Sequence, residues 1–250
     1  MSLPRMRLAR APLAMVLGSL AISACAHNTA IGRDQLILVS DDDVEALANT
    51  SWSQINETMP ESREPEDLAR LDRVSNRVLR AVGASPQDWE FKLFVSDDLN
   101  AFALPGGKVG MTTGMMAFCR NDDELAAILG HEIAHVELHH SAERISRQMA
   151  TEGLIDLTGG KTSGLLEIGA TLGVILPFSR VQELEADRLG LRYMHRAGYR
   201  PQAAVDLWTR MLAAQSGPQA PDWLSTHPAK ATRIEALERE VARLRLEPVS

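Results

Sequence analysis

Cysteine and aromatic residues are scarce in this 250-residue sequence, which contains two cysteines and only 4% Phe, Trp and Tyr. With Cys25 and Cys119 alone, the chain cannot rely on a disulfide framework. Cys119 ends the apolar stretch MMAFC and has no visible reactive setting, so we expect a buried small hydrophobic residue rather than a nucleophile. Few aromatics beside plentiful Ala and Met favour a mainly helical body.

An excess of positive charge is also absent. The formal net charge is −7, and it becomes −10 if Arg5, Arg7 and Arg10 are removed with an N-terminal leader. Such a surface argues against nucleic acid as a partner. The length fits one domain of roughly 200 residues with a sizeable core. The sequence shows no 34-residue helical repeat, so we do not expect an appended repeat domain.

The N-terminus has the pattern of a secretory leader. Three arginines precede an uncharged run over residues 11–24 that is too short for a comfortable membrane span. The run ends in Ile22, Ser23, Ala24 and Cys25, similar to a bacterial lipobox in which Cys25 becomes the lipidated first residue. Cleavage after Ala26 is the alternative, because the sequence also fits an A-x-A site. We predict a signal peptide over residues 1–24 and an outer-membrane lipoprotein facing the periplasm, with a soluble periplasmic protein as the alternative.

The strongest chemical signal is the motif HEIAH at residues 131–135. About one chain in seventy of this length and composition would contain HExxH by chance, so the motif needs support from its context. On a helix, His131 and His135 project from one face, one turn apart, and can reach a single ion. Glu132 points to a neighbouring face, where its carboxylate can serve as general base rather than as a ligand.

The surrounding residues predict that this motif is helical. Asn121 precedes three acidic residues and, with Glu124, has the pattern of an N-cap with a capping box. Apolar residues then recur at helical spacing, at Leu125, Ile128, Leu129, Ile133 and Val136. The helix is therefore predicted independently of the metal argument.

A catalytic zinc site needs three protein ligands and an open position. A compact arrangement with the third histidine close behind the motif would require Gly at 138 and His at 141, and the sequence has Leu138 and Ser141. A straight helix would carry His139 two turns from His131. We therefore interpret His139 and His140 as solvated surface histidines.

A second helix offers a carboxylate ligand. The segment SRVQELEADRLG places Glu183 and Asp187 four residues apart, with Glu185 turned away from both; alone, they could be charges on an ordinary amphipathic helix. HEIAH followed by this helix resembles the zinc metallopeptidases of the CAAX prenyl protease and HtpX type, in particular their periplasmic lipoprotein branch. The resemblance implies one Zn²⁺ per chain with Glu183 as third ligand, and Asp187 as a carboxylate that hydrogen-bonds a ligand histidine.

Segments before the motif extend the resemblance. The patterns predict a short strand at 35–40, a helix after residue 43, a helix over 67–82 ending at Gly83, and strands over 89–95 and 109–113. The stretch NAFALPGGKVGMTTGMM is similar to the family's hairpin before the metal helix, where a strand edge pairs with extended substrate. This implies a substrate-binding edge at Lys108, Val109, Gly110 and Met111; a plain structural hairpin is the alternative.

In the C-terminal part, the sequence predicts a helix that begins at Pro201, then a loop, and then a final helix over 228–246. The loop sequence LSTHPAKATRI resembles the THP…RI segment of the periplasmic branch. This implies that His227 faces the metal cleft, as a movable fourth ligand or as a donor to the oxyanion, whereas a lone loop histidine is usually just exposed. Arg233 is a weaker candidate for the same cleft. The Gly-rich apolar segment 154–178 is predicted to be a buried helix, a mobile cover, or a membrane-grazing segment.

These features predict a mainly helical α+β fold, gluzincin-like, with a small antiparallel hairpin or sheet beside the HExxH helix. Residues 25–66 would form a tether and accessory segment, and residues 67–250 the metallopeptidase domain. The resemblance implies a zinc endopeptidase at the outer membrane that cleaves unfolded or misassembled envelope proteins, with the outer-membrane assembly machinery as a candidate partner. A zinc-containing chaperone or adaptor with little proteolysis is the competing hypothesis, and a structural HExxH in an unrelated helical protein is the third.

Overall fold

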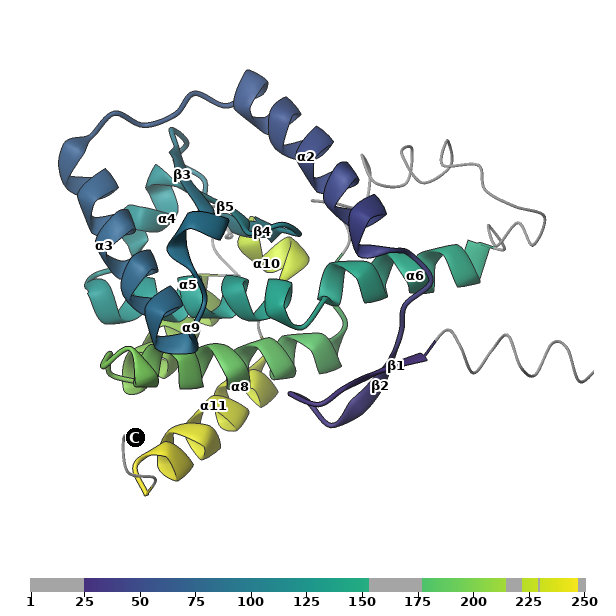
Figure 1. Cartoon of the computed structure of the whole chain (residues 1–250). Helices are drawn as coiled ribbons and strands as arrows, with labels where there is room; N and C mark the ends of the chain where they lie inside the picture. Colours follow the sequence, from purple (N-terminus) through teal and green to yellow (C-terminus); the bar gives the residue numbers. More distant parts are fainter. Residues whose placement is uncertain (1–24, 153–176, 215–221, 229, 247–250) are drawn as a thin grey trace, which may run out of the picture.

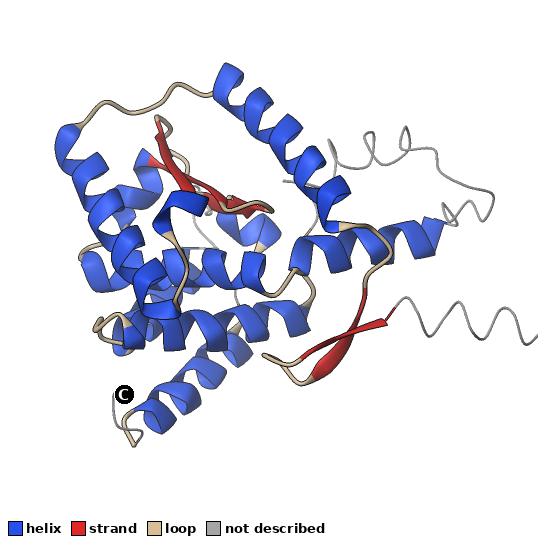
Figure 2. Ribbon diagram, viewed as in Figure 1, coloured by secondary structure: helices blue, strands red, loops and turns tan. Residues whose placement is uncertain are grey.

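The computed structural model describes residues 25–152, 177–214, 222–228 and 230–246. The leader at 1–24 and most of the predicted cover at 154–178 lie outside these residues. The strands are β1 (Cys25–Asn28), β2 (Arg33–Leu36), β3 (Glu90–Phe94), β4 (Ala101–Leu104) and β5 (Lys108–Thr112). The helices are α2 (Asp41–Thr58), α3 (Pro65–Val82), the short 3-10 helix η1 (Pro86–Asp88), α4 (Thr113–Phe118), α5 (Asp122–Glu137), α6 (His140–Glu152), α8 (Arg180–Arg196), α9 (Gln202–Ala214), α10 (Trp223–Thr226) and α11 (Ala231–Leu244). The predicted mainly helical α+β class is confirmed (Figure 2).

Helix α5 runs through the middle of the molecule, with the three-stranded sheet on one side and α8 on the other (Figure 1). Its apolar residues Leu125, Ile128, Leu129 and Ile133 are completely buried, so the helix is enclosed by the core. Asn121 caps it by accepting a hydrogen bond from the backbone N–H of Glu124, as the sequence predicted.

Helices α5 and α8 lie antiparallel and very close together. A Cβ added at Gly190 of α8 would stand 2.7 Å from the backbone of Gly130 and His131 of α5, a distance at which the helices would have to move apart. The two glycines therefore permit the contact. The approach brings side chains from the first turn of α8 to the histidines at the end of α5.

The sheet next to α5 has the strand order β3-β5-β4. β4 and β5 form the predicted antiparallel hairpin, in which Gly106 and Gly107 take positive φ values of 77° and 73°. β3 joins β5 in parallel. The substrate edge predicted at Lys108, Val109, Gly110 and Met111 is wrong, because β5 is the central strand and is paired on both sides. The two outer strands are β3 and β4.

The N-terminal segment packs onto the rest of the chain. β1 and β2 form a hairpin beside α6 and α8, and α2 begins at Asp41, where Ser40 accepts the capping hydrogen bond from Asp43 (Figure 1). Trp52 of α2 makes edge contacts with the rings of Phe94 and Phe102 on the sheet. Residues 25–58 therefore pack against the rest of the described chain at two places, beside α6 and α8 and on the sheet.

Cys119 and Gly83 both lie in the surroundings that the sequence predicts. Cys119 is 2% exposed, and burial raises the pKa of its thiol to about 12, so it is a buried hydrophobic residue as predicted. α3 ends at Gly83, whose φ of 78° forms the predicted C-terminal cap.

In the part of the chain that the structure describes, no helix combines the length and apolar character needed to cross a membrane.

Candidate metal centre

The two histidines of HEIAH meet at the buried end of α5. His131 and His135 are 1% and 2% exposed, and their Nε2 atoms are 3.1 Å apart. Burial lowers the pKa of His135 well below its ordinary value, although Glu183 opposes this effect. The imidazole is therefore neutral, which is the form that binds a metal ion.

Helix α8 brings Glu183 to this pair. Ser179 and Gln182 form a capping box that starts the helix, and Glu183 follows in the first turn. Its Oε1 is 3.4 Å from Nε2 of His135, and its Oε2 is 3.7 Å from Nε2 of His131. The residue that the resemblance implied as third ligand thus lies beside the other two.

His227 completes the group from the short helix α10, which it caps. Its Nδ1 lies 2.9 Å from Oε1 of Glu183 and 3.2 Å from Nε2 of His131. The ring is buried between Trp223, whose centroid is 4.6 Å away in a stacked geometry, and Phe178 at 5.1 Å. His227 is therefore held inside the cleft.

These four side chains fit a zinc ion. Their donor atoms lie within 4.8 Å of one another, and the neighbouring distances just given run from 2.9 to 3.7 Å. A tetrahedron with zinc bonds of about 2.0–2.1 Å has edges of about 3.3–3.4 Å. Imidazole nitrogens and a carboxylate oxygen are the donors that catalytic zinc sites use. The set His131, His135 and Glu183, with His227 as a fourth donor, therefore matches zinc in both spacing and chemistry.

Asp187 and Arg233 support this group from one side. Oδ1 of Asp187 is 3.0 Å from Nδ1 of His131, and Arg233 donates to both Asp187 oxygens at 2.7 Å. Nη1 of Arg233 also lies 2.5 Å from Oε2 of Glu183. Burial alone would raise the pKa of Asp187, but Arg233 and His131 bring it below its ordinary value. The pKa of Glu183 also lies well below its ordinary value, again against the effect of burial and chiefly because of Arg233. Arg233 is therefore more central than the sequence indicated.

Glu132 lies next to the group without joining it. Its Oε1 accepts a hydrogen bond of 2.9 Å from the indole N–H of Trp223, and Nε2 of His227 is 3.6 Å from the same oxygen. The contact of Trp223 with Glu132 was not predicted from the sequence. A rare tryptophan three residues before the THP segment was the available signal.

The interpretation of His140 as a surface histidine is wrong. α5 ends at Glu137, and His139 takes a positive φ of 52°, so the chain bends before α6 begins. The bend buries His140 completely and brings its Nδ1 to 2.9 Å from Nδ1 of His135. His139 is exposed, as predicted. A straight continuation of α5 was the assumption that failed.

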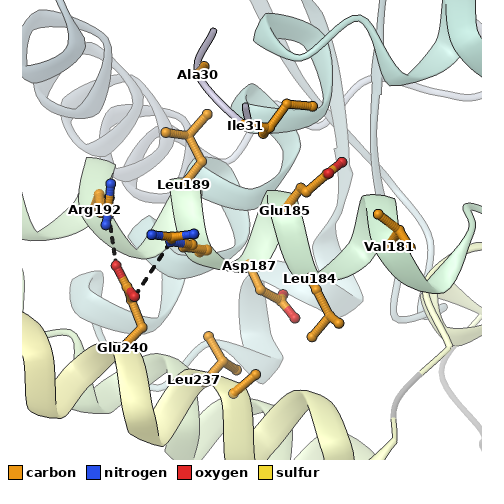
Figure 3. Close-up of a pocket in the computed structure, with 12 residues that line it drawn as sticks. Ala30, Ile31, Val181, Leu184, Glu185, Asp187, Leu189, Arg192, Leu237 and Glu240 are labelled. Carbon is orange, nitrogen blue, oxygen red and sulfur yellow. Dashed lines mark hydrogen bonds and ion pairs between the residues drawn. The ribbon is translucent and has the colours of Figure 1, made fainter. Parts of the chain in front are cut away.

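A cavity of about 180 Å³ adjoins Glu132 and His227 and is bordered by Asn100, Phe102 and Ala103 at β4. A second cavity, of about 340 Å³, lies outside the metal group between α8, α11 and the β1–β2 turn (Figure 3). Of these two cavities, the one at β4 is therefore the one that reaches Glu132 and His227.

The chain is similar in sequence to known metallopeptidases over most of its length. The sequence model of peptidase family M48 matches residues 65–241. Over 195 residues the chain is 39% identical to mitochondrial metalloendopeptidase OMA1 of Schizosaccharomyces pombe, covering 74% of this chain and 56% of the relative. Over 231 residues it is 32% identical to mitochondrial metalloendopeptidase OMA1 of Bos taurus, covering 83% and 44%. Over 235 residues it is 27% identical to the beta-barrel assembly-enhancing protease of Yersinia pestis, covering 88% and 48%. The chain spans about half the length of these curated relatives.

Replacing Arg233 should destabilise the metal-free protein. Arg233→Met leaves two buried carboxylates without this cation, and we expect a loss of about 3–5 kcal/mol in the free energy of unfolding. Denaturant unfolding in the presence of a chelator measures it. The matched control is Arg188→Met, which removes a half-exposed arginine 3.6 Å from Glu240 and should cost less than about 1 kcal/mol. Equal losses in the two variants would contradict the assignment.

Proposed function

This chain belongs to peptidase family M48, and on that premise we propose that it is a zinc-dependent endopeptidase acting on extended or unfolded polypeptides. The observation that carries the proposal is the buried group of His131, His135, Glu183 and His227, with Glu132 next to it. A carboxylate that stays outside the donor set is what general-base catalysis requires, and a purely structural zinc site has no use for it.

Each residue has a role in the proposed reaction. His131, His135 and Glu183 would hold the ion, and Asp187 would fix the proton of His131 on Nδ1, 3.0 Å from its own Oδ1. Zinc supplies Lewis acidity, which makes water a nucleophile near neutral pH and polarises a carbonyl group. Glu132 would take the proton of the attacking water on a carboxylate oxygen and return it to the leaving amine.

The edge of β4 is the best candidate for substrate binding. β4 is one of the two outer strands of the sheet, and the cavity that it borders is also lined by Glu132 and His227. An extended peptide added to this strand would form backbone hydrogen bonds regardless of its side chains. Folded substrates offer few such segments, which supports a preference for unfolded chains.

His227 has two candidate roles, as movable fourth ligand and as oxyanion donor. The position of its Nδ1, in contact with Glu183 and His131, supports the fourth-ligand role in the arrangement described. Trp223 on the same short helix donates its indole N–H to Glu132. Outward movement of α10 would therefore release the fourth position and the base together.

The N-terminal leader supports a proposal for where the protein resides in the cell. Cys25 within its lipobox-like sequence supports lipid attachment at the outer membrane, on the periplasmic side. The similarity to a protein named beta-barrel assembly-enhancing protease supports envelope proteins as substrates and their assembly machinery as partner. The OMA1 relatives are mitochondrial by name, so the relatives alone do not decide the compartment.

A zinc-containing chaperone is the second candidate function. It is favoured by one observation, that His227 supplies a fourth donor, since structural zinc sites are normally closed by four protein ligands. Such a protein would bind unfolded chains at β4 without cutting them.

Glu132→Gln should separate these functions. The amide cannot accept the proton, so we expect zinc content to stay at the wild-type level and cleavage of an unfolded test protein to fall by about 10²–10⁴-fold. Glu137→Gln, an exposed position on the same helix, is the matched control and should cleave normally. Full proteolysis by the zinc-loaded Glu132→Gln protein would sink the catalytic assignment. A zinc-loaded wild-type protein that prevents aggregation of the test protein but does not cleave it would support the chaperone.

His227→Ala tests the fourth-ligand role. If His227 blocks the open position, its removal should raise the rate of cleavage measured with the same test protein, while zinc remains bound by three residues. A fall of about 10²–10³-fold would instead assign His227 to the oxyanion.

Cys25→Ser tests the anchor. Without the thiol, acylation at this position is impossible, and the protein should move from the membrane fraction to the soluble fraction of the envelope. Unchanged membrane fractionation and unchanged mass of the mature N-terminal peptide would contradict lipidation.

A further inference from the structure

We propose that His140, Glu185 and Arg33 form a positioning chain that holds the ligand His135 in one tautomer and orientation, so that the N-terminal β1–β2 hairpin is part of the metal site. The inference rests on the proposed function only in taking His135 as a zinc ligand.

The contacts determine where each proton lies. A histidine that binds zinc through Nε2 carries its proton on Nδ1, which in His135 is 2.9 Å from Nδ1 of His140. His135 therefore donates and His140 accepts. His140 must then carry its own proton on Nε2, which lies 3.2 Å from Oε2 of Glu185. Each N–H in the chain has an acceptor, and Nε2 of His135 remains free for the ion.

Arg33 fixes the outer end of this chain. Its Nε and Nη2 donate to the two oxygens of Glu185 at 2.6 and 2.8 Å, and Nη1 and Nη2 donate to Glu143 of α6 at 2.7 and 2.8 Å. Gln35 of the same hairpin donates to the carbonyl of Leu138 at 2.8 Å, at the bend between α5 and α6. The hairpin thus holds both the acceptor and the bend that places His140.

Burial strengthens these contacts. His140 is completely buried, and the side chains of Glu185 and Arg33 are 15% and 23% exposed. In such surroundings an aligned hydrogen bond is stronger than in water, and a misplaced partner is costly.

The two ligand histidines are therefore supported differently. Nδ1 of His131 lies directly against Asp187, whereas Nδ1 of His135 is linked to a carboxylate only through the neutral ring of His140. Figure 3 shows Glu185 and Asp187 leaving α8 in different directions, Glu185 toward Ile31 of the hairpin turn. The M48 match begins at residue 65, so Arg33 comes from outside the matched region. This chain of contacts is how the N-terminal segment reaches the metal group.

The inner link is tested by zinc affinity, measured by competition with a chromophoric chelator, and by the visible spectrum of the Co²⁺-loaded protein. His140→Leu removes the acceptor and should weaken zinc binding by about 10–100-fold and change the cobalt spectrum. His140→Asn should recover most of the affinity, because its side-chain oxygen can occupy the place of Nδ1. His139→Asn, the same change at the adjacent exposed residue, should bind zinc like wild type.

The outer link is tested by two methionine variants. Arg33 and Arg147 both donate to Glu143, but the contacts of Arg33 extend to Glu185. Arg33→Met should weaken zinc binding by about threefold to tenfold, a smaller effect than loss of the direct acceptor, and Arg147→Met should leave it unchanged. Equal affinities in these two variants would overturn the part assigned to the hairpin.

Circular dichroism of each metal-free variant establishes that it is folded. Wild-type zinc affinity in a folded His140→Leu protein overturns the positioning chain, whatever its proteolytic activity. A wild-type protein that binds zinc but does not cleave contradicts the peptidase proposal alone, because affinity and spectrum are read without substrate.

Discussion

The close approach of α5 and α8 is the constraint on which the site depends. Gly130 and Gly190 remove the side chains that would separate the two helix backbones at their crossing. Because the helices run antiparallel, the approach sets the first turn of α8 against the last turns of α5. Glu183 then reaches the imidazoles of His131 and His135, which no local feature of either helix could ensure.

Gathering these groups has an electrostatic cost. Glu183 and Asp187 lie almost completely out of water, where an unpaired carboxylate would take up a proton. Arg233 contacts both and is itself fully buried, and its ring neighbours Trp208 and Trp223 lie 5.7 and 5.8 Å from the guanidinium carbon. The same arginine donates to the carbonyl of His227. Thus the arginine that compensates the buried charges also holds the backbone at His227 and Pro228.

The site is consequently built from segments far apart in the chain. One of them, α10 with His227, contacts the donor group and Glu132 directly. α10 carries Trp223, which holds Glu132, and is followed directly by His227, which enters the donor group. On the opposite side, the N-terminal hairpin reaches His135 through Glu185 and His140. The metal group is therefore in contact with distant segments of the chain on both sides.

Short-range patterns in the sequence were sufficient to predict the start of a helix after Asn121, the pairing of histidines in HEIAH and, through family resemblance, the position of Glu183 beside them. Caps and apolar periodicity are decided by residues within a few positions of one another, and this is why they could be recognised. The burial of His140, the central place of β5 and the part played by Arg33 were decided only by the tertiary structure. A bend after Glu137, the order of strands and a contact between residues 33 and 185 all depend on packing between distant segments, which local sequence patterns do not record.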